Sequence, residues 1–178
     1  MRQTLKDYRN LGFGVLFTLF FVFLDQWTKH LAVWRLKDKP SISIIPGVFE
    51  LFYLENRGAA FGILQGQKSF LIIMTVTALL ILFYLYTRIP EKPRYRYLRL
   101  ILILLISGAI GNFIDRCTQD YVIDFFYFSL IDFPVFNVAD IYVTVSACLL
   151  AVLFFFYYKE EEIDALFQQF AFWKKKDK

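Results

Sequence analysis

The stretch LGFGVLFTLFFVFLDQWTKHLAVW, residues 11–34, decides the fold class of this chain. A helix needs roughly 20 consecutive and mostly apolar residues to cross a bilayer. The continuous apolar run ends at Leu24, so a spanning helix has to continue past Asp25. Asp25 and Lys29, one helical turn apart, are therefore predicted to lie within one end of a membrane helix.

A cleavable signal peptide is the alternative interpretation of this stretch, because basic residues precede its apolar run. No small-residue cleavage site follows Leu24, and the chain continues with DQWTKHLAVW. We therefore expect a retained first membrane helix.

Further apolar runs occupy residues 70–86, 98–116 and 140–158, and 58% of the 178 residues are hydrophobic. This composition is typical of a lipid-embedded chain rather than a soluble domain. The sequence predicts an all-α polytopic membrane protein whose four transmembrane helices form a single membrane domain over residues 1–178.

Two smaller elements are predicted outside the spans. Residues 40–66, between the first two helices, alternate in polarity and contain many β-formers, which favours a small extracytoplasmic β-sheet platform. Residues 160–178 place Ile163, Leu166, Phe167 and Phe170 on one helical face, with lysines after them. This pattern predicts a C-terminal amphipathic helix in the cytoplasmic interface.

The basic residues predict the orientation of the helices. RIPEKPRYRYLR, residues 88–99, is the most basic segment between predicted spans, and cytoplasmic loops accumulate Lys and Arg. This places both termini in the cytoplasm, although Arg35, Lys37 and Lys39 on the opposite side run against the rule. The formal net charge of +4 fits contact with anionic lipid headgroups, and it requires no nucleic acid.

Polar side chains collect on the predicted extracytoplasmic side. Ionisable groups at membrane depth cost roughly 2.5–3.5 kcal/mol each, so each one is a candidate for function. A chance distribution would use both membrane sides, so this convergence predicts a functional site. The residues that converge are Asp25, Asn56, Asn112, Arg116, Asp124, Asn137 and Asp140.

Simpler roles remain open for several of these residues. Asp25 and Lys29 have the spacing of an i,i+4 ion pair. Asn112, Asp115 and Arg116 share one helical face, where a helix end meeting headgroups would explain the two charges. Asn137 is predicted as an N-cap, with Asp140 at the third helical position near the positive end of the helix dipole.

The residue types favour carboxylate chemistry. The chain has a single His30, no HExxH or GxSxG motif, and no base beside Cys117 or Cys148, which we interpret as bystanders. Two adjacent carboxylates share one proton, and the ionised one can activate water against an amide. A proton- or cation-coupled transporter subunit and a structural scaffold are the alternatives. A transporter predicts polar groups at successive depths rather than at one end.

Short blocks of the sequence resemble the bacterial lipoprotein signal peptidases, also called signal peptidase II. These blocks are DQWTK (25–29), ENRGAAFG (55–62), GNFIDR (111–116), VIDFF (122–126) and FNVAD (136–140). The resemblance implies an intramembrane aspartic endopeptidase of the bacterial cytoplasmic membrane. It would remove signal peptides from prolipoproteins by cutting before a diacylglyceryl-modified cysteine. The resemblance also implies no metal or cofactor, and inhibition by globomycin-like cyclic peptides.

The resemblance assigns residue roles by motif. It implies Asp124 and Asp140 as the catalytic pair. It implies substrate-binding or supporting roles for Asn56, Gly58, Asn112, Arg116 and Asn137, and supporting roles for Asp25 and Lys29. Asp132, between the two catalytic candidates, is expected to be a dispensable loop carboxylate.

Overall fold

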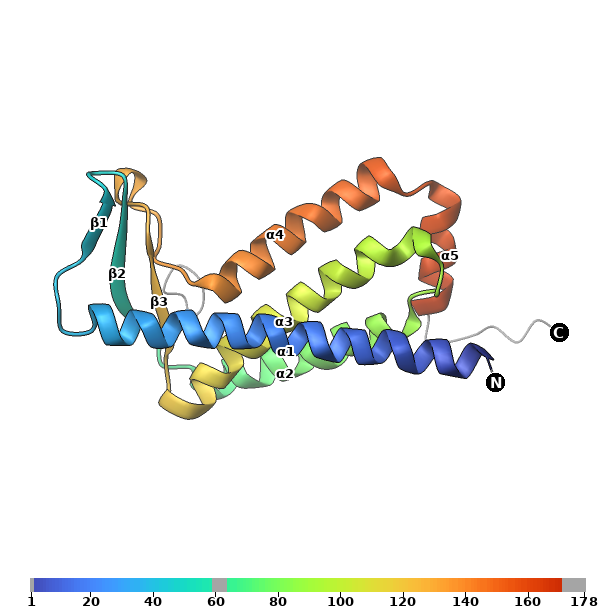
Figure 1. Cartoon of the computed structure of the whole chain (residues 1–178), viewed down its shortest axis with the longest axis horizontal. Coiled ribbons are helices and arrows are strands. Elements are labelled where there is room, and N and C mark those ends of the chain that lie inside the picture. The colour runs from blue at the N-terminus through green and yellow to red at the C-terminus, as the bar shows by residue number, and fades with distance from the viewer. Residues whose placement is uncertain (1, 59–63, 171–178) are drawn as a thin grey trace.

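The computed structural model describes residues 2–58 and 64–170 and is mostly helical (Figure 1). Its long helices run roughly along the longest axis, with a small sheet at one end and α5 across the other. They are α1 (Arg2–Leu36), α2 (Lys68–Arg88), α3 (Arg96–Gln119) and α4 (Val138–Val152), which a π-helical turn continues at Leu153–Tyr157.

The predicted spans are confirmed by length and composition. Within the described residues, four helical segments are long and apolar enough to cross a membrane: Leu11–Leu36, Lys68–Arg88, Pro93–Gln119 and Val138–Tyr157. Most of their large apolar side chains face outward, as lipid contact requires.

Helix α3 is central, because it packs against α1, α2 and α4. Small residues permit this close approach. A Cβ added at Gly108 would lie 2.6 Å from the Ala139 carbonyl oxygen of α4. A Cβ at Gly111 would collide with the Asp25 carboxylate and lie 3.3 Å from the Ala139 Cβ. The helices α1, α3 and α4 therefore meet at Gly111.

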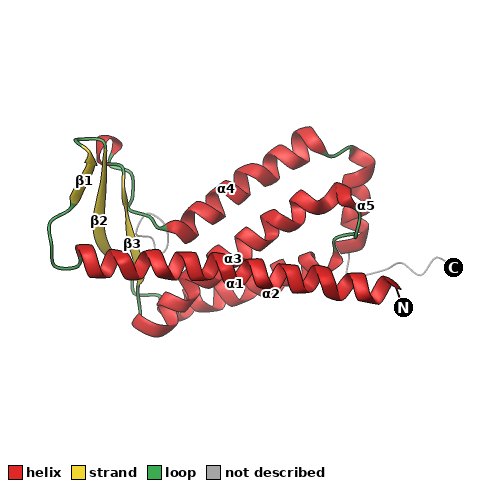
Figure 2. Ribbon diagram, in the orientation of Figure 1, coloured by secondary structure: helices red, strands yellow, loops and turns green. Residues whose placement is uncertain are grey.

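The sheet contains three antiparallel strands in the order β1–β2–β3 (Figure 2). The strands β1 (Ile42–Ile45) and β2 (Phe49–Asn56) lie within the predicted platform. The third strand, β3 (Val122–Tyr127), comes from the connection between α3 and α4 and was not predicted. It pairs Leu54 with Asp124, and a bridge between Phe126 and Phe136 leads the chain from β3 back to α4.

Helix α5 (Glu160–Phe170) confirms that the C-terminal segment begins as a helix. Its apolar face packs on the bundle through Leu166, which is 1% exposed in a cluster with Tyr95 and Tyr158, whereas Phe167 is 62% exposed. The predicted interfacial face is therefore used largely within the protein. The rest of the predicted tail, residues 171–178, lies outside the described residues.

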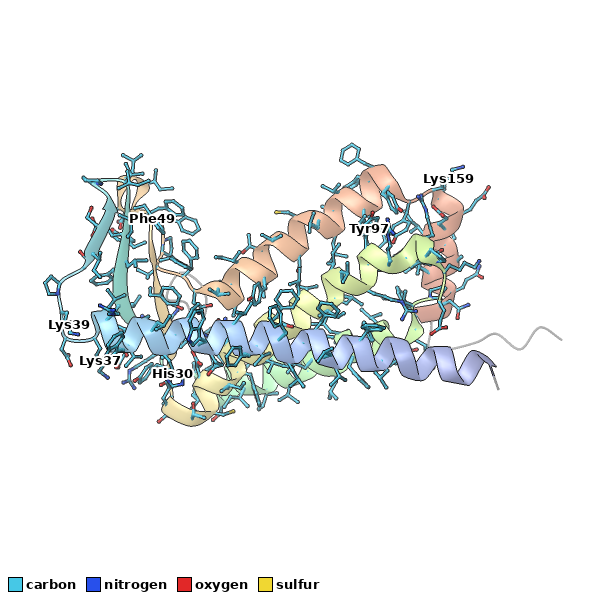
Figure 3. The ribbon with its side chains drawn as sticks, viewed as in Figure 1. His30, Lys37, Lys39, Phe49, Tyr97 and Lys159 are labelled. Carbon is cyan, nitrogen blue, oxygen red and sulfur yellow. The ribbon has the colours of Figure 1, made fainter. Side chains whose placement is uncertain are left out.

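Basic and aromatic side chains lie at both ends of the bundle (Figure 3). His30, Lys37 and Lys39 lie toward the sheet end, and Tyr97 and Lys159 lie at the opposite end. At that opposite end, Arg94 pairs with Glu162 of α5 at 2.9 Å from Nε to Oε1 and 3.0 Å from Nη2 to Oε2. This ion pair joins the α2–α3 connection to α5.

Candidate active site

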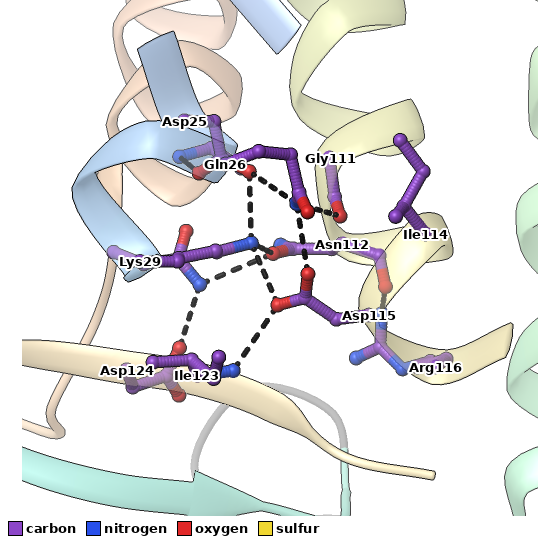
Figure 4. A network of polar contacts seen from close by, with 12 residues as sticks. Asp25, Gln26, Lys29, Gly111, Asn112, Ile114, Asp115, Arg116, Ile123 and Asp124 are labelled. Carbon is purple, nitrogen blue, oxygen red and sulfur yellow. Dashed lines mark hydrogen bonds and ion pairs between the residues drawn. The ribbon is translucent and has the colours of Figure 1, made fainter. Parts of the chain in front are cut away.

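The α1 residues Asp25 and Lys29 form the predicted ion pair, with 2.9 Å between Lys29 Nζ and Asp25 Oδ2. Both residues are buried, at 0% and 1% exposure, so they face protein rather than lipid. Lys29 Nζ also lies 2.9 Å from Oδ2 of Asp115 on α3 (Figure 4). A simple pair was predicted, whereas the ammonium is held between two carboxylates.

Asp25 also joins α1 to the beginning of α4. Its Oδ1 accepts a hydrogen bond from the Ala139 backbone N–H at 2.9 Å. The neighbouring Gln26 donates from Nε2 to Asp115 Oδ1 at 2.8 Å and to the Gly111 carbonyl at 3.2 Å. These bonds hold α1, α3 and α4 together where the glycine permits contact.

Asn112 connects this charge cluster to Asp140. Its Oδ1 accepts from Lys29 Nζ at 2.9 Å and from Asn137 Nδ2 at 3.1 Å. With the oxygen engaged by these donors, the amide nitrogen points to Asp140 and donates to its Oδ1 at 2.8 Å. Asp140 is thereby held by a side chain of α3.

Asn137 is the N-cap of α4, as predicted. Its Oδ1 accepts from the Asp140 N–H at 3.0 Å, and its own N–H donates to Asp140 Oδ2 at 3.1 Å, which completes a capping box. The remaining amide nitrogen donates to Asp124 Oδ1 at 2.6 Å. Asn137 therefore caps the helix and also contacts both predicted catalytic aspartates.

Asp124 lies on strand β3, so it joins the cluster from the sheet rather than from a helix. Leu54 pairs with Asp124 and Asn56 with Val122, so Asn56 and Asp124 are diagonal neighbours on one face of the sheet. Asn56 Nδ2 donates to Asp124 Oδ2 at 2.9 Å, and its Oδ1 accepts from the Gly58 N–H at 2.9 Å. Both oxygens of the 1%-exposed Asp124 thus accept amide hydrogen bonds.

Arg116 lies at the edge of the same cluster. Its Nη2 donates to the Gly58 carbonyl oxygen at 3.0 Å, and its Nη1 to the Asn112 carbonyl oxygen at 3.4 Å. The guanidinium therefore ties α3 to the end of β2. The motif residues that follow Gly58, including Gly62, fall in residues 59–63 and lie outside the described residues.

The electrostatics of the site favour a retained proton. Burial, and next the negative charge of Asp140, raise the pKa of Asp124 to about 7. The amide donors from Asn56 and Asn137 oppose this shift but do not cancel it. Near neutral pH, one proton can therefore be held by the two neighbouring carboxylates.

All nine predicted site residues lie in this one cluster at the sheet end of the bundle. Asp132 lies apart in an exposed loop, where its backbone has a φ of +48° and its Oδ1 accepts from the Tyr127 hydroxyl at 2.7 Å. His30, Cys117 and Cys148 are exposed outside the cluster. In residues 2–58 and 64–170, no three or more His, Cys, Asp or Glu side chains are grouped as metal ligands would be.

Asp115 and Gln26 belong to this cluster but were not predicted as site residues. The position of Asp115 on the face of Asn112 was a signal for it, but a contact with lipid headgroups explained the charge equally well. Its 2% exposure excludes that explanation. For Gln26, only its place within DQWTK was a signal.

Proteins with similar sequences belong to one family. Residues 17–156 match the family described as Signal peptidase (SPase) II. The lipoprotein signal peptidase of Streptococcus thermophilus is 50% identical over 131 residues, which cover 73% of this chain and 84% of that protein. That of Caldanaerobacter subterraneus subsp. tengcongensis is 44% identical over 141 residues, covering 79% and 94%.

Solved structures show the same architecture. A structure described as a bacterial membrane enzyme has a TM-score of 0.69 at 32% identity and covers 93% of this chain and 94% of its own. A second structure with that description has a TM-score of 0.70 at 33% identity and covers 82% and 94%. The chain is a multi-pass membrane protein that belongs to the signal peptidase II family of proteases.

Proposed function

We propose that this protein is an aspartic endopeptidase that removes signal peptides from prolipoproteins, with Asp124 and Asp140 as its catalytic pair. One observation carries the proposal. The Asn137 side chain donates to Asp124 while its Oδ1 and backbone N–H hold Asp140, so one residue fixes carboxylates from β3 and α4. Two carboxylates held in this way can bind one water between them.

The pair works with one shared proton. The ionised aspartate takes a proton from the bound water as its oxygen attacks the scissile carbonyl carbon, and the protonated aspartate gives its proton to the carbonyl oxygen. Collapse of the tetrahedral intermediate breaks the C–N bond, and the proton taken from water passes to the leaving amine. The hydroxyl proton of the intermediate returns to the pair, which restores its starting state.

The substrate class follows from the family and from the position of the site. We infer a prolipoprotein whose signal helix lies among the spans and whose diacylglyceryl-modified cysteine lies at the outer interface, with cleavage before that cysteine. The sheet would cover the outer part of the substrate, because its strands β2 and β3 carry Asn56 and Asp124 of the site. A globomycin-like cyclic peptide would compete for this site.

The orientation is proposed from the charges at the two ends. The end of α1 at Arg2 and helix α5 lie away from the sheet, near the basic α2–α3 connection (Figure 1). Because cytoplasmic loops accumulate Lys and Arg, this supports a cytoplasmic location for both and an outer location for the site. The basic residues near the sheet end, which run against this orientation, make contacts within the protein. Lys37 pairs with Glu55 at 3.1 Å, and Arg35 lies 4.1 Å from the Trp34 ring.

Cysteine labelling tests this orientation. Cys117 is exposed near the sheet end of α3, and Lys159 is exposed at the opposite end. A membrane-impermeant maleimide should label Cys117 in intact spheroplasts. It should label a Lys159→Cys variant at the new position only after permeabilisation. The reverse pattern would place the site in the cytoplasm.

Mass spectrometry of a diacylglyceryl-modified prolipoprotein incubated with purified protein tests the catalytic assignment. Asp124→Asn and Asp140→Asn should bind the substrate and leave it intact, whereas wild type should release a peptide ending just before the lipidated cysteine. Asp132→Asn is the control, because its carboxylate lies in the exposed loop, and it should cleave normally. Full cleavage by Asp124→Asn or Asp140→Asn would exclude the pair.

A further inference from the structure

A buried charge cluster lies beside the proposed catalytic pair. Asp25, Lys29 and Asp115 are each at most 2% exposed, and the ammonium lies 2.9 Å from an oxygen of each carboxylate. Replacing buried ionic groups by well-packed apolar side chains is often neutral or stabilising. Helix packing alone therefore does not explain this cluster, and its contacts with the site indicate a further role.

The first contact runs from Asp115 to strand β3. Asp115 Oδ2 accepts the backbone N–H of Ile123 at 3.2 Å, and Ile123 directly precedes Asp124 (Figure 4). Pairing with β2 fixes Asp124 relative to Asn56 within the sheet. The bond from Asp115 fixes this strand relative to α3, and thus relative to the helices that carry Asp140.

The second contact runs from Lys29 to Asp140 through Asn112. Lys29 donates to Asn112 Oδ1, and Asn112 Nδ2 donates to Asp140 Oδ1. A primary amide has one acceptor oxygen and one donor nitrogen, so binding of its oxygen by the ammonium turns its nitrogen to Asp140. Asp115 in turn helps to hold the ammonium in place.

We propose that Asp115 is a positioning residue for the Asp124–Asp140 pair, acting on Asp124 through the Ile123 backbone and on Asp140 through Lys29 and Asn112. The inference rests on the proposed function, since it assigns Asp115 to the same reaction. Asp115 is 2% exposed and its oxygens bind Gln26, Lys29 and Ile123. It therefore acts through these groups rather than on the substrate.

Asp115→Asn is the principal test, because it conserves shape and leaves Asp25 to pair with Lys29. Whichever way the new amide turns, an N–H group replaces one oxygen and faces a donor that the carboxylate had bound. A misplacement of about 1 Å can lower a rate by about 100-fold, so we expect kcat to fall by about 10- to 100-fold. KM should change by less than about 3-fold, because ground-state contacts with the substrate are untouched.

The matched control is Asp120→Asn at the C-cap of the same helix. Asp120 is exposed and pairs with Lys68 at the surface, away from the site. This variant should retain the kcat, KM and pH profile of wild type. Both variants should be assayed as full-length protein in detergent, with thermal unfolding followed in parallel.

The pH profile separates positioning from a loss of folded protein. The charged groups that act on Asp124 are Asp140 on α4, Lys29 on α1 and Arg116 on α3. Asp115→Asn removes a negative charge 2.9 Å from the Lys29 ammonium, so more of that positive charge acts on Asp124 and the pKa of Asp124 should fall. The alkaline limb of kcat should therefore move to lower pH in Asp115→Asn. A simple loss of folded protein lowers activity equally at every pH.

A second variant covers the case in which Asp115→Asn does not fold. Gln26→Met removes the donor to Asp115 Oδ1 and leaves every charge in place. It should lower kcat several-fold at unchanged KM. If Asp115→Asn folds and shows wild-type kcat with an unshifted pH profile, the inference is overturned. If only Gln26→Met folds, wild-type kcat in that variant overturns it.

Parallel assays of Asp124→Asn and Asp140→Asn distinguish the two proposals. If either cleaves normally, the catalytic assignment fails and the positioning role fails with it. If both are inactive while Asp115→Asn behaves as wild type, only the positioning role is wrong.

Discussion

Gly108→Ala probes how closely activity depends on the packing of α3 against α4. The added Cβ would lie 2.6 Å from the Ala139 carbonyl oxygen and 2.9 Å from Val143 Cγ2. Ordinary contact begins near 3.4 Å, so the Ala139 oxygen has to retreat by roughly 0.8 Å. This oxygen belongs to the α4 backbone, so the beginning of the helix moves with it.

The stability cost should be modest. Overpacking costs about 1–3 kcal/mol, whereas replacing a helical glycine by alanine gains about 1 kcal/mol, so the net loss is about 0–2 kcal/mol. The effect on activity should be larger, because Asp140 directly follows Ala139. A displacement approaching 1 Å predicts that kcat falls by about 10- to 100-fold.

Gly12→Ala is the matched control, because a Cβ at Gly12 on α1 meets nothing within 4 Å. The assay compares single-turnover cleavage of a lipidated prolipoprotein with thermal unfolding in the same detergent. Gly12→Ala should retain full activity. If Gly108→Ala cleaves as fast as wild type, the contact with α4 does not control the geometry of the pair, and the reasoning is wrong.

Three further predictions concern the pH profile, the cap and the far end of the bundle. The rate of cleavage, measured between about pH 5 and pH 9, should decline as pH rises through about 7. Burial and the charge of Asp140 raise the pKa of Asp124 to about 7, and the shared proton is lost above that pH. A flat pH profile would contradict this. Asn137→Ala should lower the free energy of unfolding by about 0.5–2 kcal/mol through loss of the cap. Asn137→Ser should recover that stability but not kcat, because serine lacks the amide donor to Asp124; recovery of both would limit Asn137 to capping. Arg94→Met should lower the midpoint of thermal unfolding, because it removes an ion pair with Glu162 and a cation–π contact of 3.9 Å with Tyr157. It should leave kcat unchanged, and a fall in kcat would show coupling between the two ends.

Short-range sequence patterns predicted the membrane spans, the N-cap of α4 and one buried ion pair. The length of the apolar runs predicted the spans, and the position of Asn137 before the fourth span predicted the N-cap that is observed, although not the reciprocal bond that completes a capping box. The i,i+4 spacing of Asp25 and Lys29 likewise predicted an ion pair that is present. Each of these features depends on residues close together in the sequence.

The missed features depend on contacts between distant segments. VIDFFY becomes strand β3 because it pairs with β2 and is bridged by Phe136, and nothing within the six residues specifies either partner. Asp115 is buried because α1 packs against its face of α3, which helical periodicity does not reveal. The docking of α5 through Leu166 likewise requires the assembled end of the bundle opposite the sheet.

A double-mutant cycle on the aspartate pair tests the central claim most directly. Single-turnover cleavage of a diacylglyceryl-modified prolipoprotein is followed to long times for Asp124→Asn, Asp140→Asn and the double variant. If the two carboxylates activate one water as a unit, each single variant loses nearly all activity and the double variant is no slower than the slower single one. Losses that multiply in the double variant, or wild-type cleavage by either single variant, would contradict the claim.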